Sequence, residues 1–224
     1  MTKKKKIVSI ICCSLVGALA LAVAVPFIIF GAKSAAINTD YSYLKDSEIY
    51  SEKVEIDNIE LVTQHISCGY ATIEMMSNYY GNKVTEDELS QKNHGSISTS
   101  SSNGFLKELN SAIPAKSFIK HSYVENDMLL KEIHISLKNG NPVALEWAAK
   151  YEETWTLHFS LISSLDLGNN KITVFNPYGF VENISIEEFI DRSTFKAYKN
   201  MEFFLTFGFA FGAFEKNTIF LAKL

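Results

Sequence analysis

Cysteine is scarce in this sequence, and its three copies are unevenly placed. Cys12 and Cys13 lie in an apolar N-terminal stretch, so Cys68 is the single thiol of the chain that follows. That part of the chain therefore forms no internal disulfide. An unpaired cysteine is usually a small buried hydrophobe. A single thiol in an exported domain needs another purpose, and catalysis is one such purpose.

The signatures of metal and cofactor sites are also missing. No cluster of Cys and His has zinc-binding spacing, and neither GxxxxGK nor GxGxxG occurs. We therefore expect no metal and no cofactor. The first 36 residues hold five lysines and no acid, so acidic residues outnumber basic residues in the rest of the chain. The remainder carries a net charge of −9, five units below the −4 of the whole chain. Without a basic surface, nucleic acid is not an expected partner.

The N-terminus has the pattern of a membrane segment. Residues 1–6 form a basic head, and residues 7–32 contain no charge over 26 positions, more than the roughly 20 residues that span a hydrocarbon core. By the positive-inside rule, the head stays in the cytoplasm and the rest is extracytoplasmic. We favour an uncleaved signal-anchor over a cleaved, secreted form, because secretory signals have apolar regions of about 7–15 residues. Residues 33–59 are then expected to be a stalk, and residues 60–224 a single domain.

Within that domain, helical patterns come first and strand patterns second, which predicts an α+β fold with a mostly antiparallel sheet. The first expected helix begins at Cys68, and the others cover 85–91, 103–112, 126–138 and 186–194. The expected strands are 142–149, 156–167, 171–176, 180–184 and 218–224. The Phe-rich stretch Met201–Phe214 is expected to be a buried helix or hairpin arm. The alternative is a membrane-facing patch beside the anchor.

The stretch Gln64–Gly81, QHISCGYATIEMMSNYYG, carries the chemistry. Cys68 opens an apolar helix, and the positive end of a helix dipole is expected to lower the pKa of its thiol. The Cys68 backbone N–H and the Gln64 side-chain amide are two donors for a tetrahedral oxyanion. We expect Gly69 to let the backbone turn tightly without a side chain that blocks the approach.

A thiol nucleophile needs a base, and the base needs a residue that orients it. Among five histidines, His158 alone lies in an apolar strand pattern, where an imidazole has no packing purpose. With a turn near residues 168–169, antiparallel pairing places residue 158 opposite about 179 and residue 176 opposite about 161. Asn176 then lies within reach of the imidazole of His158. The alternative is that Asn176 is only a turn residue before Pro177.

These residues resemble those of papain-like cysteine peptidases of the bacteriocin-processing type, family 39 of the cysteine peptidases, and especially its bacterial stand-alone members. The shared motifs are Gln64-x-x-x-Cys68-Gly69, the histidine strand, and Asn176-Pro-x-Gly, in which most relatives carry Asp in place of Asn176 and a glycine one position later. The resemblance implies a papain-like fold, with Gln64 as oxyanion donor, Cys68 as nucleophile, His158 as base and Asn176 as orienting residue. Leader-peptide processors of this family are fused to transporters, so the substrate does not carry over.

The sequence thus predicts a membrane-anchored, extracytoplasmic cysteine peptidase that cleaves a peptide or amide bond through an acyl-enzyme on Cys68. Two alternatives stay open. The same residues serve acyl transfer, in which an amine replaces water as the acceptor. In the other alternative the domain is a non-catalytic binding module with an inert Cys68.

Overall fold

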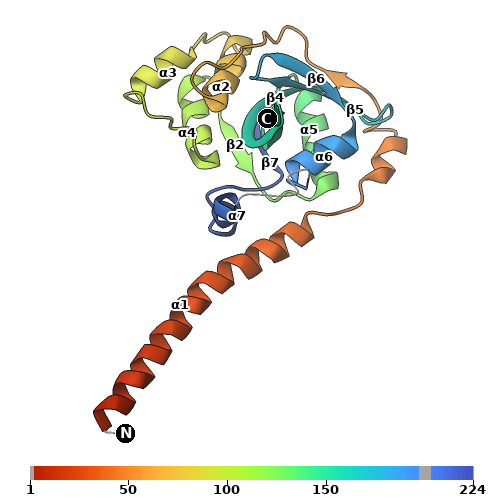
Figure 1. Ribbon diagram of the computed structural model, residues 1–224. Helices are drawn as coiled ribbons and strands as arrows, with labels where there is room; N and C mark the ends of the chain where they lie inside the picture. Colours follow the sequence, from red (N-terminus) through yellow and green to blue (C-terminus); the bar gives the residue numbers. More distant parts are fainter. Residues whose placement is uncertain (1–2, 197–202, 224) are drawn as a thin grey trace.

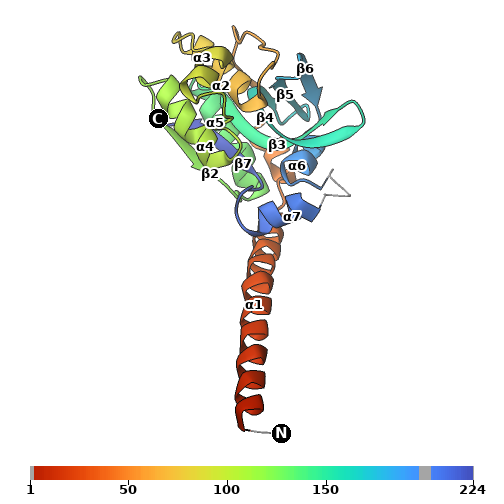
Figure 2. The same ribbon diagram turned by 60° about the vertical axis from the view of Figure 1, so that its left-hand side comes forward.

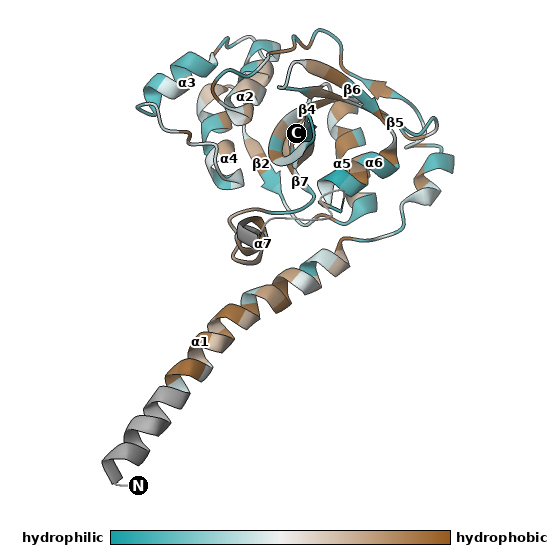
Figure 3. Ribbon diagram, in the orientation of Figure 1, coloured by the Kyte–Doolittle hydropathy of each residue, from teal (hydrophilic) through white to brown (hydrophobic). Residues whose placement is uncertain are grey.

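The computed structural model describes residues 3–196 and 203–223. Helix α1 (Lys3–Ala36) projects away from a mixed α/β domain in both views (Figures 1 and 2). Its stretch Ser14–Ala36 is long and apolar enough to cross a membrane, with a mean hydropathy of 2.5, and is not buried against the domain. Figure 3 shows mostly apolar residues along the coloured part of this helix, whereas polar and apolar residues are mixed along the ribbon of the domain.

The domain is built on one seven-stranded sheet with the order β2-β7-β3-β4-β5-β6, and β1 pairs with β4. Every neighbouring pair is antiparallel, as the sequence predicts. The strands are β1 (Val54–Glu55), β2 (Phe118–His121), β3 (Val143–Tyr151), β4 (Thr154–Asp166), β5 (Lys171–Asn176), β6 (Phe180–Ile184) and β7 (Thr218–Ala222).

Helices cover both faces of this sheet and form two hydrophobic cores. On one face α2 (Cys68–Tyr79), α3 (Glu86–Lys92) and α4 (Ser102–Ala112) contribute the core that contains Phe105 and Phe159. On the other, α5 (Asn126–Lys138) and α6 (Ile186–Ser193) contribute the core that contains Trp147. A capping box formed by Thr85 and Glu88 begins α3. Most expected elements therefore form within one or two residues of their predicted bounds.

The segment expected to be a stalk instead packs on the domain. Ile37, Leu44, Val54 and Ile56 are buried, a short helix η1 (Ser42–Asp46) lies within the segment, and β1 extends the sheet. The apolar residues are spaced too irregularly to form a periodic pattern, so the sequence did not reveal this burial.

Part of the Phe-rich stretch forms helix α7 (Phe203–Ala210), and the first two residues of Met201–Phe214 lie outside the described part of the chain. Phe209 is buried against Phe195, whereas Phe211 is exposed. The rings of Phe207 and Phe211 meet Phe27 of α1 edge-on, with centroids 5.1 and 6.4 Å away. The helix therefore packs between the domain and α1 (Figure 1).

Candidate active site

Cys68 is the first residue of α2, which packs across β4. The helix begins there because Ser67 is its N-cap, with a side-chain oxygen that accepts the Tyr70 backbone N–H at 3.1 Å. The side chain of Cys68 is half-buried. The predicted thiol is thus at a helix N-terminus, against the strand that carries His158.

The pKa of Cys68 differs from our expectation. Burial raises the pKa of the thiol above its ordinary value, and the nearby carboxyl of Glu146 acts in the same direction. Backbone N–H groups, that of Phe159 foremost, oppose this rise by donating toward the sulfur. The expected lowering of the thiol pKa by the helix terminus is therefore wrong, because desolvation of the thiolate in a packed site outweighs it.

His158 and Asn176 form the central contact of the site. Both are buried, and the Nε2 atom of His158 lies 2.9 Å from the Asn176 side-chain oxygen. Because that oxygen only accepts, Nε2 carries the proton and Nδ1 keeps its lone pair. Burial lowers the pKa of His158 to about 3, Arg192 adds to this, and the hydrogen bond to Asn176 opposes it. The ring of Tyr178 stacks on the imidazole at 4.1 Å.

A β-bulge in the β4–β5 pair decides which face of the sheet Asn176 occupies. Near the hairpin turn the register is as predicted, but it shifts by one residue between Ile162 and Ser164, so that Leu161 pairs with Phe175. Paired residues share a face and successive residues alternate. An unbroken register would put Asn176 on the face opposite to His158, and the bulge brings the two onto the same face.

Gln64 reaches the site through the turn after β5. Its backbone N–H donates to the carbonyl of Pro177 at 2.7 Å, and its side-chain oxygen is buried without a hydrogen-bond partner in the described residues. Gln64 lines a cleft of about 340 Å³ together with Thr63, Tyr151, Pro177 and Tyr178. The segment that precedes Cys68 and the turn that follows Asn176 therefore meet at one cleft.

Four charged residues outside the predicted site also contribute. Glu86 is buried and accepts backbone N–H groups from residues 65–67. Glu182 contacts Asn176, and Arg192 binds Glu182. A buried glutamate, Glu146, faces Ser102. Their positions depend on tertiary contacts, so no local motif marks them.

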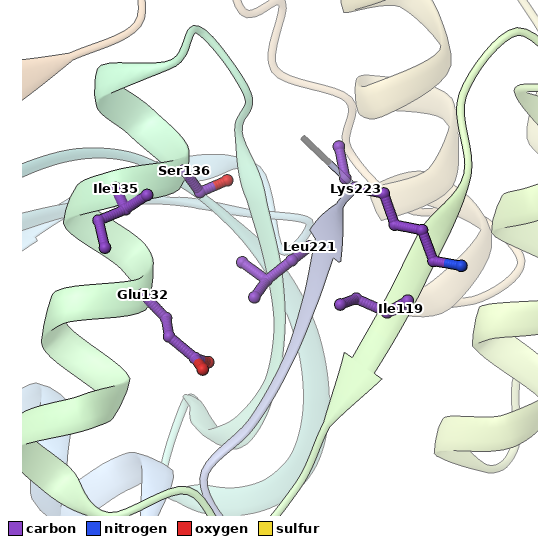
Figure 4. A pocket seen from close by; sticks show the side chains of 7 residues that line it. Ile119, Glu132, Ile135, Ser136, Leu221 and Lys223 are labelled. Carbon is purple, nitrogen blue, oxygen red and sulfur yellow. The ribbon is translucent and has the colours of Figure 1, made fainter.

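Other features lie apart from the thiol. An apolar groove of about 480 Å³ between β2, β7 and α5 is lined by Ile119, Glu132, Ile135 and Leu221, among others, none of which belongs to the site (Figure 4). Trp147, which precedes the turn between β3 and β4, is completely buried in the core. No group of His, Cys, Asp and Glu suited to a metal ion occurs in the part of the chain that the structure describes.

A protein-family model described as "Peptidase_C39 like family" matches residues 56–203. The chain is therefore a cysteine peptidase, with a mixed fold of helices and antiparallel sheet. More narrowly, it belongs to the Peptidase_C39-like family, since the matched residues make up well over half of its length. The catalytic class of the chain is thus that of the cysteine peptidases.

A similar solved structure is titled "Crystal structure of a double glycine motif protease from AMS/PCAT transporter in complex with the leader peptide". The identity is 14%, the TM-score is 0.48, and the alignment covers 76% of this chain and 97% of that one. No curated protein sequence matches the chain.

Proposed function

We propose that the protein cleaves a peptide or amide bond with Cys68 as nucleophile, His158 as base, Asn176 as orienting residue, and Gln64 with the Cys68 N–H as oxyanion donors. The observation that carries this proposal is the buried hydrogen bond from His158 Nε2 to Asn176. It holds the tautomer in which Nδ1 is free to take a proton.

The proton moves during the attack in this mechanism. A raised thiol pKa and a lowered imidazole pKa favour a neutral pair of thiol and imidazole at rest. His158 Nδ1 accepts the thiol proton as the sulfur bonds to the substrate carbonyl carbon. The oxyanion then accepts hydrogen bonds from the Gln64 amide and the Cys68 N–H. His158 protonates the leaving amine, and water hydrolyses the thioester.

The cleft beside Gln64 is the proposed substrate entry. Its walls include the aromatic rings of Tyr151 and Tyr178, whose centroids lie 4.8 Å apart, and Tyr151 is half exposed. A cleft with aromatic walls and a few polar groups suits a peptide more than a compact charged molecule. A peptide or protein substrate is therefore the proposed partner.

The test of the chemistry is turnover of a peptide library by the full-length chain, read by mass spectrometry. We expect Cys68→Ala to abolish cleavage, and His158→Ala to reduce kcat/KM by several orders of magnitude. A thioester-linked mass on Cys68 would identify the acyl-enzyme. Cleavage retained by Cys68→Ala would overturn the proposal, and products that form only with an added amine would replace hydrolysis by acyl transfer.

We further propose that α1 is a signal-anchor that holds the domain on the extracytoplasmic side of a membrane. Its 23-residue apolar stretch measures about 35 Å at 1.5 Å per residue, which matches a hydrocarbon core of about 30 Å. Lys3–Lys6 precede it, as the positive-inside rule requires for a cytoplasmic N-terminus. A cleaved signal would leave α7 without its contact to Phe27.

Membrane vesicles test this orientation. In a chain whose native cysteines are replaced, Glu153→Cys puts a thiol on a side chain that is 95% exposed. An impermeant maleimide should label it in right-side-out vesicles, and should label Thr2→Cys only in inverted ones. The reverse pattern would overturn the orientation, and a chain that lacks residue 2 after expression would show that the signal is cleaved.

A further inference from the structure

The side-chain amide of Asn176 has two ends of nearly equal size and opposite hydrogen-bonding character. If its oxygen faces His158, Nε2 donates and Nδ1 keeps its lone pair. If its nitrogen faces His158, the ring must accept there, and Nδ1 carries the proton instead. A reversed amide would therefore leave the imidazole without a lone pair toward Cys68. The site needs a device that fixes the amide.

Glu182 on β6 is such a device. Its carboxylate accepts a hydrogen bond from the Asn176 side-chain nitrogen at 2.7 Å. A carboxylate offers acceptors only, so it binds the nitrogen end of the amide and turns the oxygen end toward His158. The Tyr178 backbone N–H donates to that oxygen at 3.0 Å and favours the same orientation.

Arg192 on α6 holds Glu182 in place. The two terminal guanidinium nitrogens lie 2.6 and 3.0 Å from the two Glu182 oxygens, a bidentate pair. The third nitrogen donates to the Ala148 carbonyl at 2.9 Å, and the guanidinium lies 3.6 Å from the Trp147 ring centroid. Arg192 is 3% exposed and is the sole arginine of the sequence.

Stability alone gives little reason for this arrangement. Removing an ion pair from water costs several kcal/mol per ion, and apolar residues often replace such a pair without loss. The contacts of the pair to Asn176 and to the Ala148 carbonyl point instead to a role in orientation.

We infer that Glu182, held by Arg192, is a positioning residue of the active site that fixes the Asn176 amide and thereby the protonation of His158. The inference rests on the roles proposed above for Cys68 and His158. The carboxylate acts at one remove, through Asn176, and does not touch the reacting atoms.

A reciprocal exchange of the two side chains tests this inference. Asn176→Asp puts a second carboxylate against Glu182, so we expect kcat/KM to fall by about 100-fold, the loss typical of a misplaced catalytic group. In Glu182→Gln, Arg192 donates to the side-chain oxygen of the new glutamine. The NH₂ group of that glutamine then faces the NH₂ group of Asn176, and the two donors cannot pair. We expect a loss of at least about tenfold in kcat, with KM little changed.

The double variant Asn176→Asp/Glu182→Gln restores complementarity at the same net charge. The new amide at position 182 is then the donor, and the new carboxylate at position 176 accepts from both this amide and His158. We expect the double variant to recover most of the activity that either single change loses, which a purely additive structural effect does not do. Glu188→Gln is the matched control, since Glu188 also contacts Arg192, at 3.4 Å, but is half exposed.

Iodoacetamide labelling of Cys68, in the full chain with Cys12→Ser and Cys13→Ser, supplies a readout that needs no substrate. If the labelling rate falls in each single variant and recovers in the double variant while no peptide is cleaved, the positioning role stands and the proposed function fails. A folded double variant that is no faster than Asn176→Asp, in both turnover and labelling, would overturn the inference.

Discussion

The Glu86 carboxylate accepts the backbone N–H of Ser67, the residue that caps the helix of Cys68, at 3.0 Å. It also accepts the N–H groups of His65 at 3.1 Å and Ile66 at 3.0 Å. One buried side chain from the start of α3 thus holds three consecutive backbone groups between Gln64 and Cys68. The segment that joins Gln64, the proposed oxyanion donor, to Cys68, the proposed nucleophile, lies outside the helices and strands. Its position therefore depends on these side-chain contacts.

Replacement of Glu86 should loosen this segment. Glu86→Gln keeps the size but brings one acceptor oxygen and two donors, so at least one buried N–H loses its partner at a cost of about 1–3 kcal/mol. We expect a fall in thermal stability and a loss of about 10- to 100-fold in kcat/KM. Asp87→Asn is the control, because the Asp87 side chain is largely exposed. Full activity in Glu86→Gln would show that the segment is held by other contacts.

The alkylation rate of Cys68 should depend on pH as expected for a neutral resting pair. Because the pKa of the thiol is raised and that of His158 is about 3, no thiolate and imidazolium pair forms near neutral pH. The rate of iodoacetamide labelling should keep rising through pH 8 and above. A plateau below about pH 7 that His158→Ala removes would contradict this and indicate an ion pair.

Glu146 should make the protein less stable as the pH rises. Burial raises its pKa to about 8, from an unfolded value near 4.5. The folded state therefore binds the extra proton between these values, and stability falls with rising pH over that window, by up to about 1.4 kcal/mol per unit. Glu146→Gln should remove the fall and raise the thermal midpoint at pH 8 more than at pH 5. Equal shifts at both pH values would contradict the assignment.

The same substitution should make Cys68 more reactive. The charge of Glu146 raises the pKa of the thiol, so its removal should lower that pKa and increase the alkylation rate at pH 8. Glu215→Gln is the comparison, because Glu215 contributes to the raised pKa of Glu146, whereas the leading causes of the raised Cys68 pKa include Glu146 and not Glu215.

Gly69 is required by a close contact, in contrast to the tight turn that we expected. A Cβ at this helical position would lie 2.3 Å from the side-chain oxygen of Thr99 and 2.5 Å from its Cβ. Gly69→Ala should therefore cost about 1–3 kcal/mol of stability, as overpacking does. The double variant Gly69→Ala/Thr99→Gly should recover most of it, as measured by urea unfolding. No recovery would show that the strain arises elsewhere.

The sequence by itself was enough to predict most of the helices and strands and the contact between His158 and Asn176. Helix caps at Thr85 and Ser185 and the hairpin after Asp166 follow from local chemistry, so their positions needed no tertiary information. His158 was identifiable because an imidazole in an apolar strand has no packing purpose, and Asn176 because it ends the next strand.

Tertiary structure alone decided the rest. The bulge between Ile162 and Ser164 sets the face of Asn176, and no residue pattern in the hairpin marks it, because either register keeps apolar residues inside on a sheet that is buried on both faces. Segments that are distant in the sequence together bury Cys68. This burial raises the pKa of its thiol, whereas the sequence predicted a lowered pKa. Glu182 contacts Asn176 from a neighbouring strand, and Arg192 binds Glu182 from a later helix, so their part in the site appears only once the chain is folded.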